Sequence, residues 1–159
     1  MRKLKSFRSE KANSLMSWYK TKNPLRVIFN FILIFAARYM PSLTLKNFLY
    51  RLTGMKVGRN VAVGLSAVFD IFFPELIELC DNCIIGYGTT VLAHEFLQKE
   101  WRTGNVRIGR NVLIGANSTI LAGVSIGNNS VVGACSLVNE DIPANSFYAG
   151  VPARKIKAI

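Results

Sequence analysis

The sequence is poor in histidine, cysteine and acidic residues, and each shortage excludes a class of protein. It has one histidine, His94, and three cysteines, which cannot form an even set of disulfides. Because no secretory cleavage signal is recognisable either, a reducing, cytoplasmic location is expected. Residues 1–60 hold thirteen Lys and Arg but only one acid, Glu10, so the net charge of +11 belongs to this segment. No nucleic acid is expected as a partner, because the basic residues lack interleaved aromatics on an identifiable motif.

The sequence also lacks a hydrophobic run long enough to span a membrane. Residues 27–37 have only Asn30 as a polar residue, but eleven helical residues cover about half of the ~30 Å core of a bilayer. Pro24 suits the first turn of a helix here, and Pro41 would end it. A second short helix is predicted over residues 42–52, followed by a glycine stop. Its apolar residues share one face: Leu45, Phe48, Leu49 and Leu52.

What the sequence has in abundance is a six-residue period. Every sixth residue is Ile or Val and is usually followed by glycine. This period is neither that of a helix nor that of an isolated strand, and it is typical of a solenoid whose large aliphatic side chains point inward. The chain is therefore predicted to be an all-β solenoid, a parallel β-helix of hexapeptide repeats over residues 55–149 with a basic tail at 150–159. The most regular positions are Ile108, Ile114, Ile120, Ile126, Val132 and Val138.

The segment before the repeats, residues 1–54, has two interpretations that do not exclude each other. One is a helical cap, which would cover the strand edges at an open solenoid end. The other is an interfacial anchor, in which residues 1–40 contact a membrane surface. The nearly all-round apolar character of residues 27–37 favours burial, and hence the cap. The side chains that would enter lipid are Trp18, Phe29, Phe31, Ile32 and Phe35.

The repeat fails at two places, and chemistry is expected there. The unit that begins at Phe69 is degenerate, and the frame shifts after Phe73-Pro-Glu. Residues 97–105 are polar, contain one tryptophan and are predicted to be a loop thrown out from the coil. His94 lies just before this loop. A free imidazole, with a pKa near ~6.5, suits a base that acts at physiological pH.

Hexapeptide units interrupted by one loop beside a histidine resemble the hexapeptide-repeat acyltransferases. The run from Val138 to Ile156 is similar to the segment that closes the last coil of galactoside- and maltose-type O-acetyltransferases. The resemblance covers about residues 55–159. It implies a left-handed parallel β-helix, acetyl-CoA as acyl donor, and a homotrimer with active sites between subunits. The carbonic-anhydrase-like branch needs three metal-binding histidines, which this chain lacks.

The resemblance also implies the site residues. His94 would be the catalytic base, and the backbone N–H of Ala116 would bind the oxyanion, where a serine would add a side chain. Glu140 departs from the lysine expected beside the coenzyme phosphates, and Lys155 is a further possible phosphate contact. The coenzyme-binding residues would be Ala116, Ala134, Asn139, Arg154 and Lys157.

Two acids and two cysteines leave alternatives open. Asp70 and Glu75 lie in the irregular unit and are interpreted as substrate-binding residues, or as carboxylates that orient His94; both are equally explained as turn residues. Cys80 and Cys83 have zinc-like spacing, but no second such pair exists and Cys83 occupies an inward repeat position, so no metal is expected.

The function predicted from the sequence is therefore an acetyl-CoA-dependent O-acetyltransferase. It would transfer the acetyl group directly to a hydroxyl of a sugar or cell-envelope glycan, without a covalent enzyme intermediate. The alternative is a non-catalytic β-helix that scaffolds partners or docks on a membrane surface.

Overall fold

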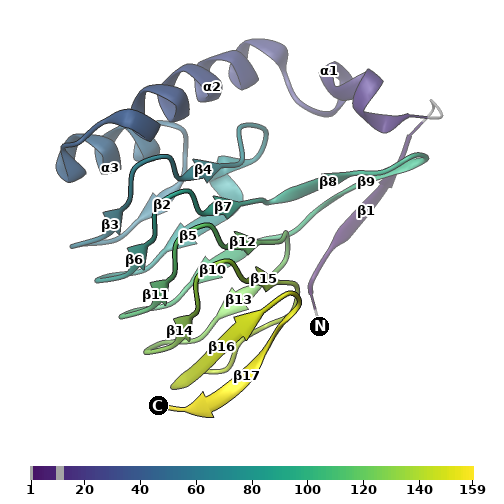
Figure 1. Ribbon diagram of the computed structural model, residues 1–159. Coiled ribbons are helices and arrows are strands. Elements are labelled where there is room, and N and C mark those ends of the chain that lie inside the picture. The colour runs from purple at the N-terminus through teal and green to yellow at the C-terminus, as the bar shows by residue number, and fades with distance from the viewer. Residues whose placement is uncertain (1, 10–12) are drawn as a thin grey trace.

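The body of the protein is a coil of short parallel strands arranged in three sheets. The structure is a computed structural model that describes residues 2–9 and 13–159. From β2 to β15, apart from one hairpin, the chain enters sheets one, two and three in rotation (Figure 1). Sheet one holds β2 (Lys56–Val57), β5 (Ile77–Leu79), β10 (Val106–Ile108) and β13 (Ser125–Ile126). Sheet two holds β3 (Ala62–Val63), β6 (Ile84–Ile85), β11 (Leu113–Ile114), β14 (Val131–Val132) and β16 (Ser146–Gly150), and sheet three holds β4 (Val68–Phe69), β7 (Thr90–Val91), β12 (Thr119–Ile120) and β15 (Leu137–Val138).

The six-residue period places the large aliphatic side chains in one column on each side of the coil. Ile108 pairs in parallel with Ile126, and Ile120 pairs with Val138. The six regular Ile and Val positions are each at most 1% exposed. The inward stacking predicted from the repeat is thus confirmed.

Asparagines make the tight turns of the coil. Asn82, Asn111, Asn129 and Asn145 have φ angles between 55° and 58°, a left-handed conformation that asparagine tolerates better than most residues. Their side chains hydrogen-bond one to the next down the coil at 2.8–2.9 Å. A glycine is needed where adjacent turns touch: a Cβ on Gly115 would lie 2.4 Å from the Ala134 nitrogen.

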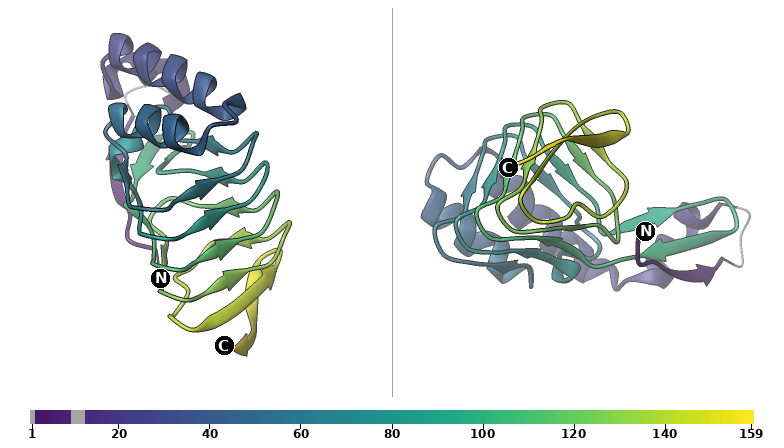
Figure 2. Two further views of the ribbon diagram at one scale, coloured as in Figure 1. Left: turned by 90° about the vertical axis from the view of Figure 1, so that its left-hand side faces the viewer. Right: turned by 90° about the horizontal axis from the view of Figure 1, so that it is seen from below.

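Residues 97–105 do leave the coil as predicted, but the prediction that they form a loop is wrong for Glu100–Thr103. The chain instead forms a hairpin of β8 (His94–Phe96) and β9 (Glu100–Thr103), which extends away from the coil (Figure 2). Strand β1 (Lys5–Arg8) pairs antiparallel with β9, so the chain is not helical throughout its N-terminal segment. Phe7 stacks on Trp101 with ring centroids 4.2 Å apart. The hairpin is therefore a three-stranded sheet rather than an isolated excursion.

Helices cover the first coil. They are the 3₁₀ turn η1 (Ser14–Ser17), α1 (Trp18–Thr21), α2 (Pro24–Tyr39) and α3 (Leu43–Leu52), and a further 3₁₀ turn, η2 (Pro74–Leu76), follows β4. Both predicted helices form, with Pro24 in the first turn of α2. The predicted apolar face of α3 exists, but Leu45, Phe48 and Leu52 point away from the coil. None of the helices in the described chain has the length and hydropathy needed to cross a membrane.

The C-terminal residues close the other end of the coil. Residues 150–159, expected to be a basic tail, contain strand β17 (Ala153–Ala158), which pairs antiparallel with β16. All of its residues after Ala153 are exposed. The two ends of the coil are therefore covered differently, one by helices and the other by a strand (Figure 1).

Candidate active site

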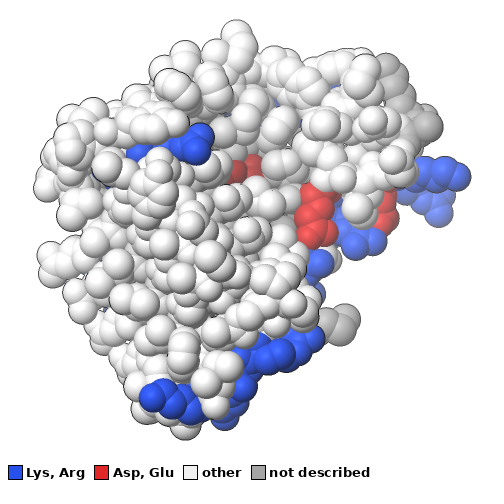
Figure 3. Space-filling model, viewed as in Figure 1, with Lys and Arg blue, Asp and Glu red and all other residues white. Residues whose placement is uncertain are grey.

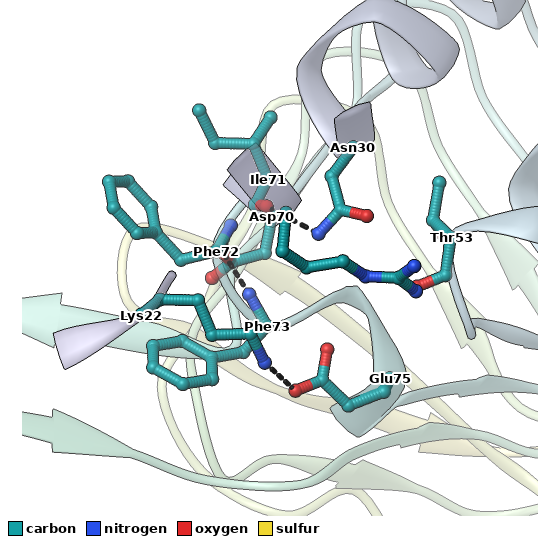
Figure 4. A network of polar contacts seen from close by, with 9 residues as sticks. Lys22, Asn30, Thr53, Asp70, Ile71, Phe72, Phe73 and Glu75 are labelled. Carbon is teal, nitrogen blue, oxygen red and sulfur yellow. Dashed lines mark hydrogen bonds and ion pairs between the residues drawn. The ribbon is translucent and has the colours of Figure 1, made fainter. Parts of the chain in front are cut away.

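A buried carboxylate organises the corner where the chain leaves sheet three for sheet one. Asp70 directly follows β4 and is 2% exposed. Its Oδ1 accepts the backbone N–H groups of Phe72 at 2.8 Å and Phe73 at 3.0 Å (Figure 4). Its Oδ2 accepts the backbone N–H of Ala93 at 2.8 Å. These bonds fix the irregular unit against the next coil. Asp70 is thus a turn residue, as one interpretation of the sequence had it.

The same carboxylate also meets His94. Oδ2 of Asp70 is hydrogen-bonded to Nδ1 of His94, whose side chain is 14% exposed. A carboxylate can only accept, so Nδ1 carries the proton and Nε2 keeps its lone pair. Among the described residues, Nε2 has no hydrogen-bond partner. The arrangement leaves one nitrogen able to take a proton from a substrate.

The surroundings of Asp70 favour the ionised form of its carboxyl group. Burial raises the pKa of its carboxyl, but the hydrogen bond and charge of His94, with the N–H groups of Phe73 and Ala93, outweigh burial and hold the pKa below its usual range. An ionised Asp70 both orients the imidazole and stabilises the imidazolium that forms when Nε2 accepts a proton.

Aromatic rings surround the imidazole on the protein side. The ring centroids of Phe72 and Phe96 lie 4.8 Å from that of His94, and that of Phe73 lies 5.8 Å away. Trp101, on β9, stacks on Phe73 at 5.7 Å. This cluster was not among the site residues predicted from the sequence. Its signal was the concentration of aromatics where the repeat fails on either side of His94.

Glu75 lies in the same segment but does not contact His94. Its carboxylate forms an ion pair with Lys22, whose Nζ lies 4.9 Å from the centre of the Phe73 ring (Figure 4). Glu75 also borders a cavity of about 520 Å³ beside sheet one, which does not include His94. The cavity is lined chiefly by polar side chains, among them Lys5, Lys56, Glu78 and Arg107.

The predicted oxyanion and pantetheine residues lie at a different corner. Ala116 and Ala134 follow β11 and β14, where the chain passes from sheet two to sheet three, whereas His94 follows sheet three. One whole side of the coil therefore separates them from His94. Within the described chain, the Ala116 N–H has no acceptor. A single chain does not bring the predicted site together.

The remaining coenzyme candidates lie at the end of the coil. Asn139 follows β15, and its buried Oδ1 has no hydrogen-bond partner among the described residues. A register shift in β17 pairs Arg154 with Ala149 and Lys157 with Phe147. Because Ala149 and Phe147 are two residues apart on one strand, Arg154 and Lys157 share a face. Lys155 pairs with Tyr148 and faces the other way.

The departure at Glu140 has a structural role. Its carboxylate forms an exposed ion pair with Arg154, with Nη1 and Oε1 3.2 Å apart. The pair holds the guanidinium near the end of the coil. Glu140 therefore positions Arg154, a candidate phosphate contact, and is not itself such a contact.

The two cysteines of the zinc-like pair are unpaired thiols. Cys83 is fully buried, and burial raises the pKa of its thiol to about 12. Among the described residues, no three His, Cys, Asp or Glu side chains cluster closely enough to hold a metal ion.

Family models match both parts of the coil. The model described as bacterial transferase hexapeptide (six repeats) matches residues 105–140, and that described as hexapeptide repeat of succinyl-transferase matches residues 54–93. YvoF of Bacillus subtilis, which is named as an acetyltransferase, is 51% identical over 91% of this chain and 85% of its own length. The galactoside O-acetyltransferase of Escherichia coli is 37% identical over 64% of this chain and 56% of its own.

A solved structure agrees with these sequence matches. A galactoside acetyltransferase in complex with coenzyme A superimposes with a TM-score of 0.69 at 27% identity, covering 86% of this chain and 82% of the other. The fold, the repeats and the relatives all indicate the same family. The chain belongs to the hexapeptide-repeat acetyltransferase family.

Proposed function

We propose that this protein transfers the acetyl group of acetyl-CoA to a hydroxyl group of a sugar, with His94 as the general base. The observation that carries the proposal is the buried Asp70 carboxylate on Nδ1 of His94, which leaves Nε2 as an acceptor. The relatives support the donor and the acceptor class, because they include a galactoside acetyltransferase in complex with coenzyme A.

The chemistry proceeds by direct transfer. Nε2 of His94 takes the proton of the acceptor hydroxyl as its oxygen attacks the thioester carbonyl, and the Asp70 charge stabilises the resulting imidazolium. The carbonyl oxygen becomes an oxyanion, which the free N–H of Ala116 binds. Collapse of the intermediate breaks the C–S bond, and His94 returns the proton to the departing sulfur of coenzyme A. The products are the acetyl ester and the free thiol.

The separation of His94 from Ala116 supports a site shared by two subunits. The corner that holds His94 on one chain would face the corner that holds Ala116 and Ala134 on its neighbour. A three-sided coil that repeats this contact closes as a homotrimer. We also infer that the coil is left-handed and works in a reducing, cytoplasmic compartment, as the resemblance and the unpaired cysteines suggest.

The coenzyme would extend from this corner to the end of the coil. Arg154 and Lys157 suit its phosphates because they share one exposed face of β17, and the unpartnered Oδ1 of Asn139 offers an acceptor beside them. Figure 3 shows blue side chains gathered at this end of the molecule.

The aromatic rings around His94 support a sugar as the acceptor. Phe72 and Phe96 are partly exposed, so they can pack against the apolar face of a sugar ring whose hydroxyl points at Nε2. The Glu75 carboxylate, whose partner Lys22 lies over the Phe73 ring, would bind a second hydroxyl.

Substitution of His94 tests the mechanism. We expect His94→Ala to lower kcat with a galactoside acceptor by about 10²–10⁴-fold, since that is what general base catalysis typically contributes. Coenzyme A should still raise the melting temperature of the variant, because His94 is not among its proposed ligands. Unchanged turnover would remove His94 from the mechanism, and a lost thermal shift would show that the substitution damaged the donor site instead.

A further inference from the structure

Helix α3 is inverted relative to ordinary surface helices, because it buries Lys46 and Asn47. Helix α2 buries Asn30 among apolar residues. Their buried sides carry polar groups that bind backbone carbonyls of the coil. Lys46 Nζ donates to the Val63 carbonyl at 3.0 Å, and Asn47 Nδ2 donates to that of Val61 at 2.8 Å. Lys46 is 1% exposed, and burial lowers the pKa of its ammonium group. The polar side of α3 is therefore turned toward the end of the coil, as is Asn30 of α2, which donates to the Ile71 carbonyl.

The opposite sides of these helices expose large apolar side chains. In α2 the exposed positions recur every three or four residues, as in the apolar stripe that normally faces a core. We call the exposed apolar side chains of α2 and α3 the outer face. It includes Ile28, Phe31, Ile32 and Phe35 of α2 and Leu45 and Phe48 of α3, which are 43–57% exposed. Figure 3 shows this end of the molecule as an almost uncharged surface, and Figure 2 shows both helices there.

Cations border the outer face, and acids are absent from it. The sequence has no Asp or Glu between Glu10 and Asp70, but it has nine Lys and Arg there. The Arg26 and Arg38 guanidinium groups lie 5.2 Å and 5.3 Å from the rings of exposed aromatic neighbours, Phe29 and Tyr39. Neither arginine has an ion-pair partner in the described part of the chain. The two ends of α2 thus carry unneutralised positive charge beside apolar side chains.

We propose that the outer face docks on the surface of an anionic phospholipid bilayer. Its apolar side chains enter the boundary between headgroups and acyl chains while the flanking arginines meet lipid phosphates. The structure changes which residues take part. Trp18 is half-buried and packs edge-on against Phe72 at 5.8 Å, whereas α3 contributes side chains that the sequence did not suggest. The inference is independent of acetyl transfer.

The charges favour lipid over a second copy of this face. Two outer faces packed together would bring arginine against arginine, and the segment between Glu10 and Asp70 offers no carboxylate to pair with them. An anionic bilayer supplies phosphates for cations beside the face and hydrocarbon for its apolar side chains, although Arg26 also donates to the Thr53 carbonyl at 2.9 Å. An apolar face with a cationic rim therefore fits lipid better than it fits itself.

Vesicle sedimentation of the full chain tests the proposal. We expect binding to vesicles of mixed phosphatidylglycerol and phosphatidylcholine, weaker binding to pure phosphatidylcholine, and weakening by salt. Phe31→Ser/Ile32→Ser should reduce the affinity by at least about tenfold. Helix α2 should persist, because serine has nearly the same helix propensity as phenylalanine and isoleucine.

A matched control removes equally exposed side chains from the other end of the coil. Ile156 and Ile159 are 57% and 60% exposed, so Ile156→Ser/Ile159→Ser should leave vesicle binding unchanged. Circular dichroism and sedimentation velocity should show native helicity and mass for both double variants. The proposal is overturned if the native chain ignores anionic vesicles, or if Phe31→Ser/Ile32→Ser binds them as well as the native chain does. A loss of oligomer mass in Phe31→Ser/Ile32→Ser alone would also overturn it, by assigning the face to a second copy.

Discussion

Replacing Asp70 with asparagine separates the two roles of this carboxylate. The asparagine has the same shape, but one of its two terminal atoms is a donor. If the amide N–H₂ faces His94, the imidazole must accept at Nδ1 and carry its proton on Nε2, which abolishes the base. In a Ser-His-Asp triad the corresponding change of tautomer lowers kcat by about 10⁴-fold. We therefore expect Asp70→Asn to lower kcat by about 10³–10⁴-fold.

The same substitution also costs stability, because Asp70 accepts three backbone N–H groups. In either orientation the amide nitrogen faces at least one of the donors of Phe72, Phe73 or Ala93. A buried donor left without a partner costs about 1–3 kcal/mol. Urea unfolding at neutral pH should show a loss of at least that size.

The pH dependence of that loss has a defined sign. The folded pKa of Asp70 lies below its unfolded value, so the unfolded state binds more protons between the two values and stability rises with pH there. The contribution of the charge is complete above the unfolded pKa, about 4, and disappears as the pH falls through the folded value. The gap in stability between the native chain and Asp70→Asn should therefore narrow in acid.

The assay follows release of the coenzyme A thiol with a galactoside acceptor, and Asp81→Asn serves as the control. Asp81 also accepts a backbone N–H, that of Arg59 at 2.8 Å, but it lies at another corner of the coil and is half exposed. This control should keep its kcat. An Asp70→Asn variant that folds and turns over within a few-fold of the native rate would refute the tautomer argument.

Two further predictions concern the coenzyme residues and the thiols. Replacing both Arg154 and Lys157 with alanine should weaken coenzyme A binding by at least about tenfold, since each cation lost from a phosphate contact removes a charge-assisted hydrogen bond; Lys155→Ala, on the opposite face of β17, should cost less in the same titration. Cys135 is exposed and should react promptly with a thiol reagent at pH 8, whereas Cys83, whose pKa burial raises to about 12, should react only on unfolding; rapid modification of two or more thiols in the native protein would contradict this.

The coil was predictable because its signal is local. Each unit carries its own inward aliphatic residue and its own turn, so the period alone stacks Ile108 on Ile126. The same register also brings the break residues together. Since Phe69 pairs with Val91, Asp70 must lie beside the residues that precede His94. The irregular turn after Asp70, closed by the N–H groups of Phe72 and Phe73, aims the carboxylate at the imidazole. Because this turn follows no repeat, the sequence left the role of Asp70 open.

The hairpin was not predictable from its own residues. Residues 97–105 are polar and break the repeat, and these features are equally typical of a loop. What makes β9 a strand is its pairing with β8 on one side and with β1 on the other, and β1 lies more than ninety residues earlier in the sequence. Long-range pairing between short polar segments leaves no periodic signal. The stack of Phe7 on Trp101 is correspondingly visible only in the structure.

The helices were predictable from the sequence, but their orientation was not. Amphipathicity predicts that a helix has an apolar stripe, but it does not tell whether that stripe faces the coil or the solvent. The strand ends of the first coil present carbonyls that need donors, so the polar stripe of α3 packs inward. Helix α2 buries mainly apolar residues, but at the active site its Asn30 Nδ2 donates to the carbonyl of Ile71 at 2.9 Å, next to Asp70 (Figure 4). Deleting the helices would therefore disturb the catalytic corner together with the outer face. A deletion variant that lost both acetyl transfer and vesicle binding would not show which region causes which loss. Point substitutions at Phe31 and Ile32 avoid this, because those side chains leave the inner contacts of α2 in place.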